Sequence, residues 1–400
     1  MTDWAGDLKT RAESLLALRR DLHRHPELSF QETRTARIVA ERLHAAGLEV
    51  RTGVARTGVV GVLRGDRPGR TVAWRADIDA LPLQERVDVP FRSVTPDVMH
   101  ACGHDGHTAI AVTLAEAMAA RRGEVAGTAV FLFQPAEEVF GGAGPMIEAG
   151  ALDGVDEVYG LHLTTRDPAG HVRVRPGAAM SSADFFDVEV VGQGGHGAYP
   201  HLSVDPITTA ARIVLGLQHL VAYELDPRET AVLTVGQLVG GTKHNVLPAR
   251  AVVRGSIRAF SDAARRQLKE RLTAYARHTA EAHRAEARVT FAGEGCPVVV
   301  NDAGAADRVR RCAAAALGAG LVAEAAPNMA SDDMSLFLAS RPGCYFNVGA
   351  APADGRPRPH HAPEFEIDER SLHTGLRVAA AVMLDALAGH PAPAPGTGVA

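Results

Sequence analysis

The sequence has little cysteine and no excess of basic residues, and each shortage excludes a class of protein. Its four cysteines lie far apart in 400 residues and form no Cys-X-X-Cys pair. This pattern argues against a disulfide framework and indicates a reducing compartment. With 42 Lys and Arg against 47 Asp and Glu, the formal net charge is −5. The chain therefore lacks the positive charge that neutralises nucleic-acid phosphates, and we expect no nucleic-acid partner.

Long apolar runs are also missing. No stretch approaches the roughly 18 uncharged apolar residues of a membrane-spanning helix. Asp3 and Asp7 precede any apolar run, so the N-terminus does not resemble a signal peptide. We therefore expect a cytoplasmic protein that does not bind membranes. At roughly 100–200 residues per domain, the length of the chain predicts two domains.

Strand-like and helix-like segments alternate in the N-terminal part of the chain and again near its end. Apolar residues at helical spacing predict a helix over residues 107–122, closed by Gly123. The alternation indicates an α/β domain whose mostly parallel sheet is flanked by helices. The predicted strands are residues 71–75, 128–133, 155–161 and 344–348.

Residues 184–293 follow a different pattern. A strand is predicted over 184–191, and Asp205 with Pro206 forms the N-cap and first position of a helix. Two strands, a long helix that starts at Ser261 and a last strand complete the order β-α-β-β-α-β. This order is that of a ferredoxin-like α+β domain, and about 110 residues are enough to complete one.

The densest group of metal-binding side chains lies in MHACGHDGH, residues 99–107, at the mouth of the predicted helix. Cys102 and His104, two residues apart on a predicted irregular loop, can direct a thiolate and an imidazole at one cation. The structural alternative is a glycine-bounded turn whose histidines cap the helix. For the whole cluster we favour a metal site, with His100 and His107 as supporting residues.

A pair of adjacent carboxylates, Glu137 and Glu138 in QPAEE, follows the second predicted strand. Adjacent carboxylates repel unless a cation or a proton lies between them, so the pair suggests a metal site in which one Glu ligates and the other acts as a base. A solvated loop with two acids is the alternative. Asp77 and Asp79 follow the first predicted strand in the same way.

Position links these residues, because ligands of open α/β sheets gather beyond the carboxyl ends of the strands. Five nitrogen, oxygen and sulfur donors exceed one tetrahedral site, so we expect two divalent ions bridged by a water or hydroxide. Mn, Zn, Co and Ni all tolerate this mixed donor set. The five donors are Cys102, His104, Glu138, His162 and His361.

The path of the chain then defines the domains. Because His361 must return to the site that Cys102 and Glu138 build, residues 184–293 are expected to be an insertion. The catalytic domain would comprise residues 1–183 and 294–400, and the insertion would serve as a lid or dimerisation domain.

The insertion carries polar residues of its own. His196 lies in the glycine-rich segment GQGGHGAYPH, where a backbone could approach a ligand closely. Asn245 lies in HNVLP and Arg258 in GSIRAF. A β-bulge turn with a surface histidine, and an Arg258 paired with a surface acid, are the structural alternatives.

Six segments between residue 22 and about residue 370 resemble the co-catalytic metallopeptidase and amidohydrolase family. That family includes aminoacylases, carboxypeptidase G-type enzymes, hippurate hydrolases and plant auxin-conjugate hydrolases, and the segments are most similar to its amidohydrolase branch. They are LHRHPELSFQE, RADIDALPLQE, MHACGHDGHTA, LFQPAEEVFGGAGPMIEAG, GQGGHGAYPH and HHAPEFEIDE.

The resemblance implies roles for individual residues. It makes Glu137 the general base and Asp79 an orienting residue behind the ligands. It makes His196 a lid histidine that polarises the scissile carbonyl. In related enzymes, this histidine reaches the active site of a neighbouring subunit. It places Asn245 and Arg258 where the family holds the free carboxylate of the substrate. The implied metal ligands are Cys102, His104, Glu138, His162 and His361.

The chain departs from the family at two positions. The peptidase branches have a ligating histidine at the position of Asp77, so Cys102 with His104 would replace that ligation. The segment SDDMSLF, residues 331–337, has the pair Asp332-Asp333 where the family more usually has Glu-Asp.

We therefore expect a metal-dependent amidohydrolase that cleaves N-acetyl, N-benzoyl or similar N-acyl amino acids through a metal-bound hydroxide and a Glu base. We also expect a homodimer or homotetramer. A dipeptidase or carboxypeptidase acting on short peptides is the alternative within the same chemistry. A metal-independent hydrolase that uses Cys102 as its nucleophile, and an inactive ligand-binding protein, are alternatives of other classes.

Overall fold

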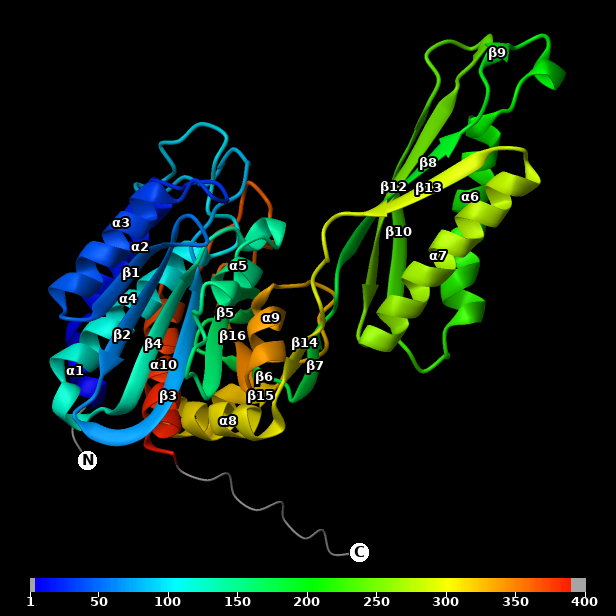
Figure 1. Ribbon diagram of the computed structural model, residues 1–400. Helices are drawn as coiled ribbons and strands as arrows, with labels where there is room; N and C mark the ends of the chain where they lie inside the picture. Colours follow the sequence, from blue (N-terminus) through cyan, green and yellow to red (C-terminus); the bar gives the residue numbers. More distant parts are fainter. Residues whose placement is uncertain (1–3, 390–400) are drawn as a thin grey trace, which may run out of the picture. The chain divides into compact units, whose positions relative to one another are not determined.

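The computed structural model describes residues 4–389, and their contacts divide the chain into two units (Figure 1). The first unit comprises Met1–Ala179, Val300–Ala326 and Asp332–Ala400, and the second comprises Met180–Val299 and Pro327–Ser331. The chain leaves the first unit through β7 (Gly177–Met180) and returns through β14 (Val299–Asn301). Over residues 4–389, the structure contains no helix with the length and apolar character that a membrane crossing requires.

An eight-stranded sheet forms the centre of the first unit, in the order β1-β2-β4-β3-β5-β16-β6-β15. The central strands β4, β3, β5 and β16 run parallel, whereas β1, β2 and β6 pair antiparallel with a neighbour. The predicted mostly parallel sheet is confirmed. The strands are β1 (Glu49–Val54), β2 (Gly58–Arg64), β3 (Arg67–Asp77), β4 (Ala126–Gln134), β5 (Glu157–Pro168), β6 (Val172–Val174), β15 (Val322–Glu324) and β16 (Gly343–Ala351).

Helices of the same unit pack on this sheet. The helix α4 is mostly apolar and buried over nearly its full length, as expected of a helix packed between other elements. Both α4 and α10 pack on β3, and they also contact each other. The helix α2 packs against α4. The helices are α1 (Trp4–Thr10), α2 (Ala12–Arg24), α3 (Thr33–Ala45), α4 (His104–Ala120), α5 (Ala143–Glu148), α8 (Ala303–Leu317), α9 (Met334–Ser340) and α10 (Arg370–Ala388).

The bounds of α4 correct two expectations. The helix begins at His104, not at residue 107, because Gly103 takes a left-handed conformation at its N-cap with φ of 91°. His104 is therefore the first residue of the helix and does not lie on an irregular loop. At the other end, the helix stops at Ala120, and Gly123 lies in the following short turn η1 (Arg122–Glu124) and not at its C-terminus.

The second unit has the predicted β-α-β-β-α-β order. Its antiparallel sheet has the strand order β10-β12-β8-β13. As predicted, the side chain of Asp205 caps the N-terminus of α6, and that of Ser261 caps the N-terminus of α7. A separate strand pair, β9 (Gly195–His196) with β11 (Val246–Leu247), lies outside this sheet. The elements are β8 (Asp184–Val191), α6 (Pro206–His219), η4 (Leu220–Glu224), β10 (Ala231–Gly240), β12 (Arg250–Ala259), α7 (Asp262–Ala282) and β13 (Glu286–Phe291).

Each unit has its own apolar core. In the first unit, α4, α10 and the central strands supply a continuous cluster of buried side chains. In the second, inward residues of β8 alternate with more exposed ones, and they pack against Leu268 and Leu272 on one stripe of α7. The two cores are separate clusters, so each unit buries apolar surface by itself.

Candidate metal centre

Most candidate donors lie near the carboxyl ends of the parallel strands of the first unit. Glu137 and Glu138 follow β4 in a short turn. His162 was expected just past a strand that ends at residue 161, but β5 continues to Pro168, so His162 lies within the strand. Cys102 precedes α4 by two residues, and His361 follows β16 on a loop. The backbone of His361 is left-handed, with φ of 63°, and its N–H donates to the backbone oxygen of Ala101 at 2.9 Å. Strained backbone held in place in this way is typical of functional sites.

The donor atoms form overlapping groups within 4.8 Å of one another. The Sγ of Cys102 lies 3.5 Å from Nε2 of His162, and Nε2 of His361 lies 3.3 Å from Oε2 of Glu138. The Nε2 of His104 lies 3.8 Å from Oε1 of Glu138. Two atoms bound to one ion at about 2.0–2.3 Å lie roughly 3.3–3.8 Å apart, so these separations suit shared ions. Three of these groups contain the predicted ligands Cys102 or Glu138: Cys102 with His104 and His162, Cys102 with Glu138 and His361, and His104 with Glu137 and Glu138. Two further groups are Asp77 with His104 and His107, and Glu137 with Asp332 and Asp333.

The backbone contacts of His104, which is buried, and of His162, which is half-buried, engage Nδ1 of each ring and leave Nε2 available to ligate. The Nδ1 of His104 contacts the backbone oxygen of Asp79 at 3.0 Å, and Nδ1 of His162 contacts the backbone oxygen of Leu163 at 2.8 Å. A carbonyl oxygen only accepts, so each Nδ1 carries the proton and each Nε2 has a lone pair. This is the usual orientation of a metal-binding histidine.

Two ligand atoms provide a direct test of whether a cation fits. Nε2 of His104 and Oε1 of Glu138 are buried, and neither has a hydrogen-bond partner within residues 4–389. A buried polar atom without a partner costs about 1–3 kcal/mol, and more if it is charged. A divalent ion between these atoms would remove that cost, so the residues present fit a metal.

Asp79 connects two of the candidate ligands. Its Oδ1 lies 3.3 Å from Nδ1 of His104. Its Oδ2 accepts from the hydroxyl of Ser29 at 2.7 Å and from the backbone N–H of Glu138 at 3.1 Å. Asp79 therefore holds the ring of His104 and the backbone of Glu138 in one orientation.

Glu137 lies in an acidic, buried environment, with only 5% of its surface exposed. Burial raises the pKa of Glu137 well above its usual value, and the charges of Asp332, Glu138 and Asp333 raise it further. Burial also raises the pKa of Asp333 to about 7, against the lowering effect of Arg75. A carboxylate in such surroundings binds a proton readily, which a general base requires.

The sequence analysis did not identify Arg75, whose side chain is buried beside this site. Its guanidinium donates to Oδ2 of Asp77 at 2.6 Å and to Oε1 of Gln134 at 2.7 Å, and Nη2 lies 3.1 Å from Asp332 and 3.2 Å from Asp333. Burial opposes the ionisation of Asp77, but His104, Arg75 and His107 outweigh it and hold the pKa of that carboxyl well below its usual range. The one signal in the sequence is a lone arginine in the apolar strand TVAWR.

The surroundings of Cys102 differ from those of a catalytic thiol. Its Sγ lies 3.8 Å from Nδ1 of His360 in addition to its contact with His162. Burial raises the pKa of the Cys102 thiol, and the charge of Glu138 raises it further. A nucleophilic cysteine needs a lowered pKa, so this environment argues against a metal-independent thiol hydrolase.

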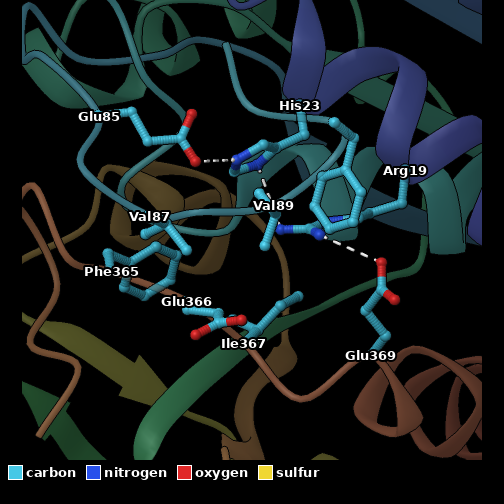
Figure 2. A pocket seen from close by; sticks show the side chains of 10 residues that line it. Arg19, His23, Glu85, Val87, Val89, Phe365, Glu366, Ile367 and Glu369 are labelled. Atoms are coloured by element: carbon cyan, nitrogen blue, oxygen red, sulfur yellow. Dashed lines mark hydrogen bonds and ion pairs between the residues drawn. The ribbon is translucent and has the colours of Figure 1, made fainter.

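A second group of buried charges lines a cavity of about 210 Å³ in the same unit (Figure 2). His23 bridges two carboxylates, with Nδ1 2.8 Å from Asp105 and Nε2 3.0 Å from Glu85. Arg19 lies 2.8 Å from Asp105 and 3.2 Å from Glu369. Because these charges are paired with one another, we interpret the group as a support for Asp105, the second residue of α4.

The remaining predicted residues belong to the second unit. His196 is exposed on β9, where its Nδ1 accepts from the N–H of Ala198 at 3.0 Å, and the backbone oxygen of Asn245 accepts from Gly197 at 3.0 Å. The pairing of β9 with β11 therefore brings His196 and Asn245 into the same part of this unit.

Arg258 lies near the end of β12 and is partly buried. Its Nη1 donates to the backbone oxygen of Met329 and to Oγ of Ser331, both at 2.9 Å. Within the described part of the chain, no ion pair joins Arg258 to an acidic side chain, so the alternative of a surface ion pair is not observed. The positive charge of Arg258 therefore remains available to a ligand.

Comparison with known proteins gives a consistent result. The model of peptidase family M20/M25/M40 matches residues 73–385. The N-acyl-L-amino acid amidohydrolase of Geobacillus stearothermophilus is 44% identical over 291 residues, 72% of this chain and 79% of that protein. The N-acetyl-L-cysteine deacetylase of Bacillus subtilis is 37% identical and covers 92% of this chain and 86% of its own. Thermostable carboxypeptidase 2 of Saccharolobus solfataricus is also 37% identical, over 92% of this chain and 94% of its own.

Solved structures have the same architecture. A protein from methicillin-resistant Staphylococcus aureus superposes with a TM-score of 0.91 at 35% identity, over 97% of this chain and 100% of its own. The YxeP protein of Bacillus subtilis, a dinuclear metal-binding peptidase of the M20 family, has a TM-score of 0.82 at 34% identity, over 95% of this chain and 99% of its own.

Proposed function

The chain belongs to peptidase family M20/M25/M40 and is a metal-dependent hydrolase of amide bonds, and we propose that it releases the free amino acid from N-acyl amino acids. The acyl groups would be small, such as acetyl or benzoyl. The observation that carries the proposal is the pair of buried atoms, Nε2 of His104 and Oε1 of Glu138, that have no hydrogen-bond partner in the described chain.

We assign two divalent ions to this site, held by five side chains. Bound there, such ions lower the pKa of water and polarise the scissile carbonyl. Asp79 keeps the proton of His104 on Nδ1, and the backbone oxygen of Leu163 does the same for His162. Both Nε2 atoms would therefore be available to hold the ions. The assigned ligands are Cys102, His104, Glu138, His162 and His361.

Glu137 is assigned as the general base. Its Oε2 lies 3.9 Å from Nε2 of His104, so it is beside the ligands and not behind them. It would take a proton from the attacking water and give it to the leaving nitrogen, as the two steps of amide hydrolysis require. Burial and then the neighbouring acids raise the pKa of Glu137, and this raised affinity for a proton supports the role.

Residues of the second unit are assigned to substrate binding. Residues 184–293 would act as a lid. His196 would stabilise the developing oxyanion by donating a hydrogen bond. The guanidinium of Arg258 would bind the α-carboxylate through two parallel hydrogen bonds, and Asn245 would donate a third. The neutral acceptors now bound to Arg258 support this assignment, because they leave its charge uncompensated.

We further propose that the chain forms a homodimer or homotetramer through the second unit and acts in the cytoplasm. The outer strands of its sheet are β10 and β13, and β10 exposes 45% of Leu238 and 55% of Val239. An exposed apolar edge strand tends to be covered by a partner.

Similarity to the thermostable carboxypeptidase favours a second candidate, hydrolysis of short peptides. Both substrate classes carry a free α-carboxylate, so the assigned role of Arg258 suits either. A hydrolysis screen of the metal-reconstituted enzyme separates the two. We expect turnover of N-acetyl, N-benzoyl and indole-acetyl amino acids to exceed that of dipeptides, and loss of turnover after chelation. Faster cleavage of dipeptides would favour the peptidase, and activity that resists chelators would refute the metal-dependent reaction.

A further inference from the structure

The third histidine of the MHACGHDGH segment, His107, is buried beside the metal centre, and the proposed reaction does not use it. It lies three residues after His104 on α4 and only 2% of its surface is exposed. Its Nδ1 lies 2.6 Å from Oδ1 of Asp77, and its Nε2 lies 2.9 Å from the backbone nitrogen of Leu163. Because a backbone N–H only donates, Nε2 accepts, and Nδ1 carries the proton and donates a hydrogen bond to the carboxylate of Asp77. Both ring nitrogens are therefore engaged.

These contacts distinguish His107 from a metal ligand. Asp77, His104 and His107 lie close enough together to hold an ion. However, Oδ1 of Asp77 accepts from His107, and Oδ2 of Asp77 accepts from Arg75 at 2.6 Å. An ion at this place would compete with these two short hydrogen bonds of Asp77. The Nε2 of His104, in contrast, has no hydrogen-bond partner in the described chain.

The partner of His107 lies next to a candidate ligand. The pairing of β5 with β3 ends at Gly160. The backbone N–H of Leu163 therefore lies past the paired part of β3 and finds no hydrogen-bond acceptor on that strand. His107 provides the acceptor in its place. The carbonyl of the same residue, Leu163, accepts from Nδ1 of His162 at 2.8 Å. The rings of His107 and His162 also meet edge to face, with centroids 4.8 Å apart.

We propose that His107 is a positioning residue for the metal site. It fixes the backbone of Leu163 through Nε2 and the ring of His162 by direct contact, and Asp77, itself held by Arg75, fixes the tautomer of His107. Asp77 would thus influence the metal site indirectly, through His107 and then His162, without binding an ion itself. This inference rests on the assignment of His162 as a metal ligand.

Two substitutions at His107 test the proposal. Glutamine keeps an acceptor for the N–H of Leu163, whereas leucine fills similar space without one. The measurement is the affinity of each of the two sites for Zn²⁺ and Co²⁺, by competition with a chromogenic chelator. Loss of a residue that orients a ligand typically weakens metal binding by about 10–100-fold. We expect that loss at one site in His107→Leu, a shifted visible spectrum of its Co²⁺ form, and recovery of most of the affinity in His107→Gln.

A matched control is Thr113→Val, which alters a buried side chain on the same helix whose hydroxyl has no hydrogen-bond partner in the described chain. It should leave both affinities unchanged. The thermal unfolding midpoint of each metal-free protein separates a general loss of stability from a specific loss of metal binding. His107→Leu with both affinities within about twofold of wild type would overturn the proposal, as would a His107→Gln protein that binds as weakly as His107→Leu.

His162→Ala separates this inference from the assignment on which it rests. If His162→Ala loses metal while His107→Leu does not, only the positioning role fails. If His162→Ala keeps both ions at wild-type affinity, the assigned ligand set itself is wrong.

Discussion

The two units present their candidate functional side chains differently. In the first unit, the side chains of Glu137, His104 and Glu138 are buried and close to further charges, although 53% of the His361 side chain is exposed. In the second unit, His196 is exposed, and Arg258 contacts only neutral oxygen atoms. Burying charge is costly unless it is paired, protonated or bound to an ion, so the first arrangement favours a bound cation. The second leaves its groups free to meet a ligand that arrives from solvent.

This difference suggests a division of labour. The geometry of the first unit is set by hydrogen bonds formed during folding, so its donors are oriented before substrate binds. The second unit would contribute recognition. Substitutions in the first unit should therefore affect metal binding or the chemical step, and those in the second should affect the choice of substrate.

The largest effect is expected from Glu137→Gln. Removal of a general base typically costs about 10²–10⁴-fold, so we expect kcat to fall at least that far. Because Glu137 is assigned as the base and not as a ligand, both metals should remain bound. The checks are steady-state kinetics and elemental analysis of the same preparation.

Glu138→Gln is the control for that experiment. It removes an assigned ligand, so it should lower metal content as well as turnover. If Glu138→Gln affects only turnover and Glu137→Gln only metal content, the two roles are reversed.

A core substitution tests whether the units are independent. Leu268→Ala truncates a fully buried side chain in the core of the second unit and should cost about 2–5 kcal/mol of its stability. Because the two cores are separate, metal content should stay unchanged. Leu114→Ala, which truncates a fully buried leucine of α4, is the matched change in the first unit and should lower metal affinity as well. Denaturant unfolding with metal analysis distinguishes the two, and loss of metal in Leu268→Ala would refute independence.

Arg258→Ala tests the recognition role of the second unit. Loss of one charge-assisted contact to the carboxylate should cost about 2–4 kcal/mol in kcat/KM for an N-acyl amino acid. The carboxamide of the same substrate should be affected much less. The ratio of kcat/KM for the acid and the amide, in wild type and variant, is the measurement. A ratio that Arg258→Ala leaves unchanged would exclude Arg258 as the carboxylate-binding residue.

The smallest expected effect is a partial recovery of activity in mixed oligomers. If His196 serves the site of a neighbouring subunit, inactive Glu137→Gln and inactive His196→Ala chains should complement each other when they exchange. The hybrid would contain one site with both residues intact. No recovery after proven subunit exchange would place His196 in the site of its own chain.

Much of the fold follows from pattern. Periodicity predicted the central strands and the β-α-β-β-α-β order, because buried strands and amphipathic helices have different spacings. The left-handed Gly103 was missed, and with it the position of His104 as the first residue of α4. A single glycine determined that boundary, and apolar spacing does not report its φ angle.

The candidate donors could be named from the MHACGHDGH cluster and from polar residues near the ends of predicted strands, but their supports could not. Arg75 contacts Gln134 and Asp333, which are 59 and 258 residues away in the sequence. His107 and His104 belong to the same helical turn, yet only Nε2 of His104 is left without a partner in the described chain. Which donor is free and which is engaged depends on such distant contacts, and local spacing does not encode them.

Metal stoichiometry of wild type and Cys102→Ser tests the central claim most directly, because Cys102 belongs to two of the overlapping donor groups. Elemental analysis after gentle purification should approach two equivalents of divalent metal per wild-type chain. Cys102→Ser should lose metal and turnover, since a serine hydroxyl is a poor substitute for a thiolate ligand. A Cys102→Ser protein that keeps both metals and full activity would contradict the account.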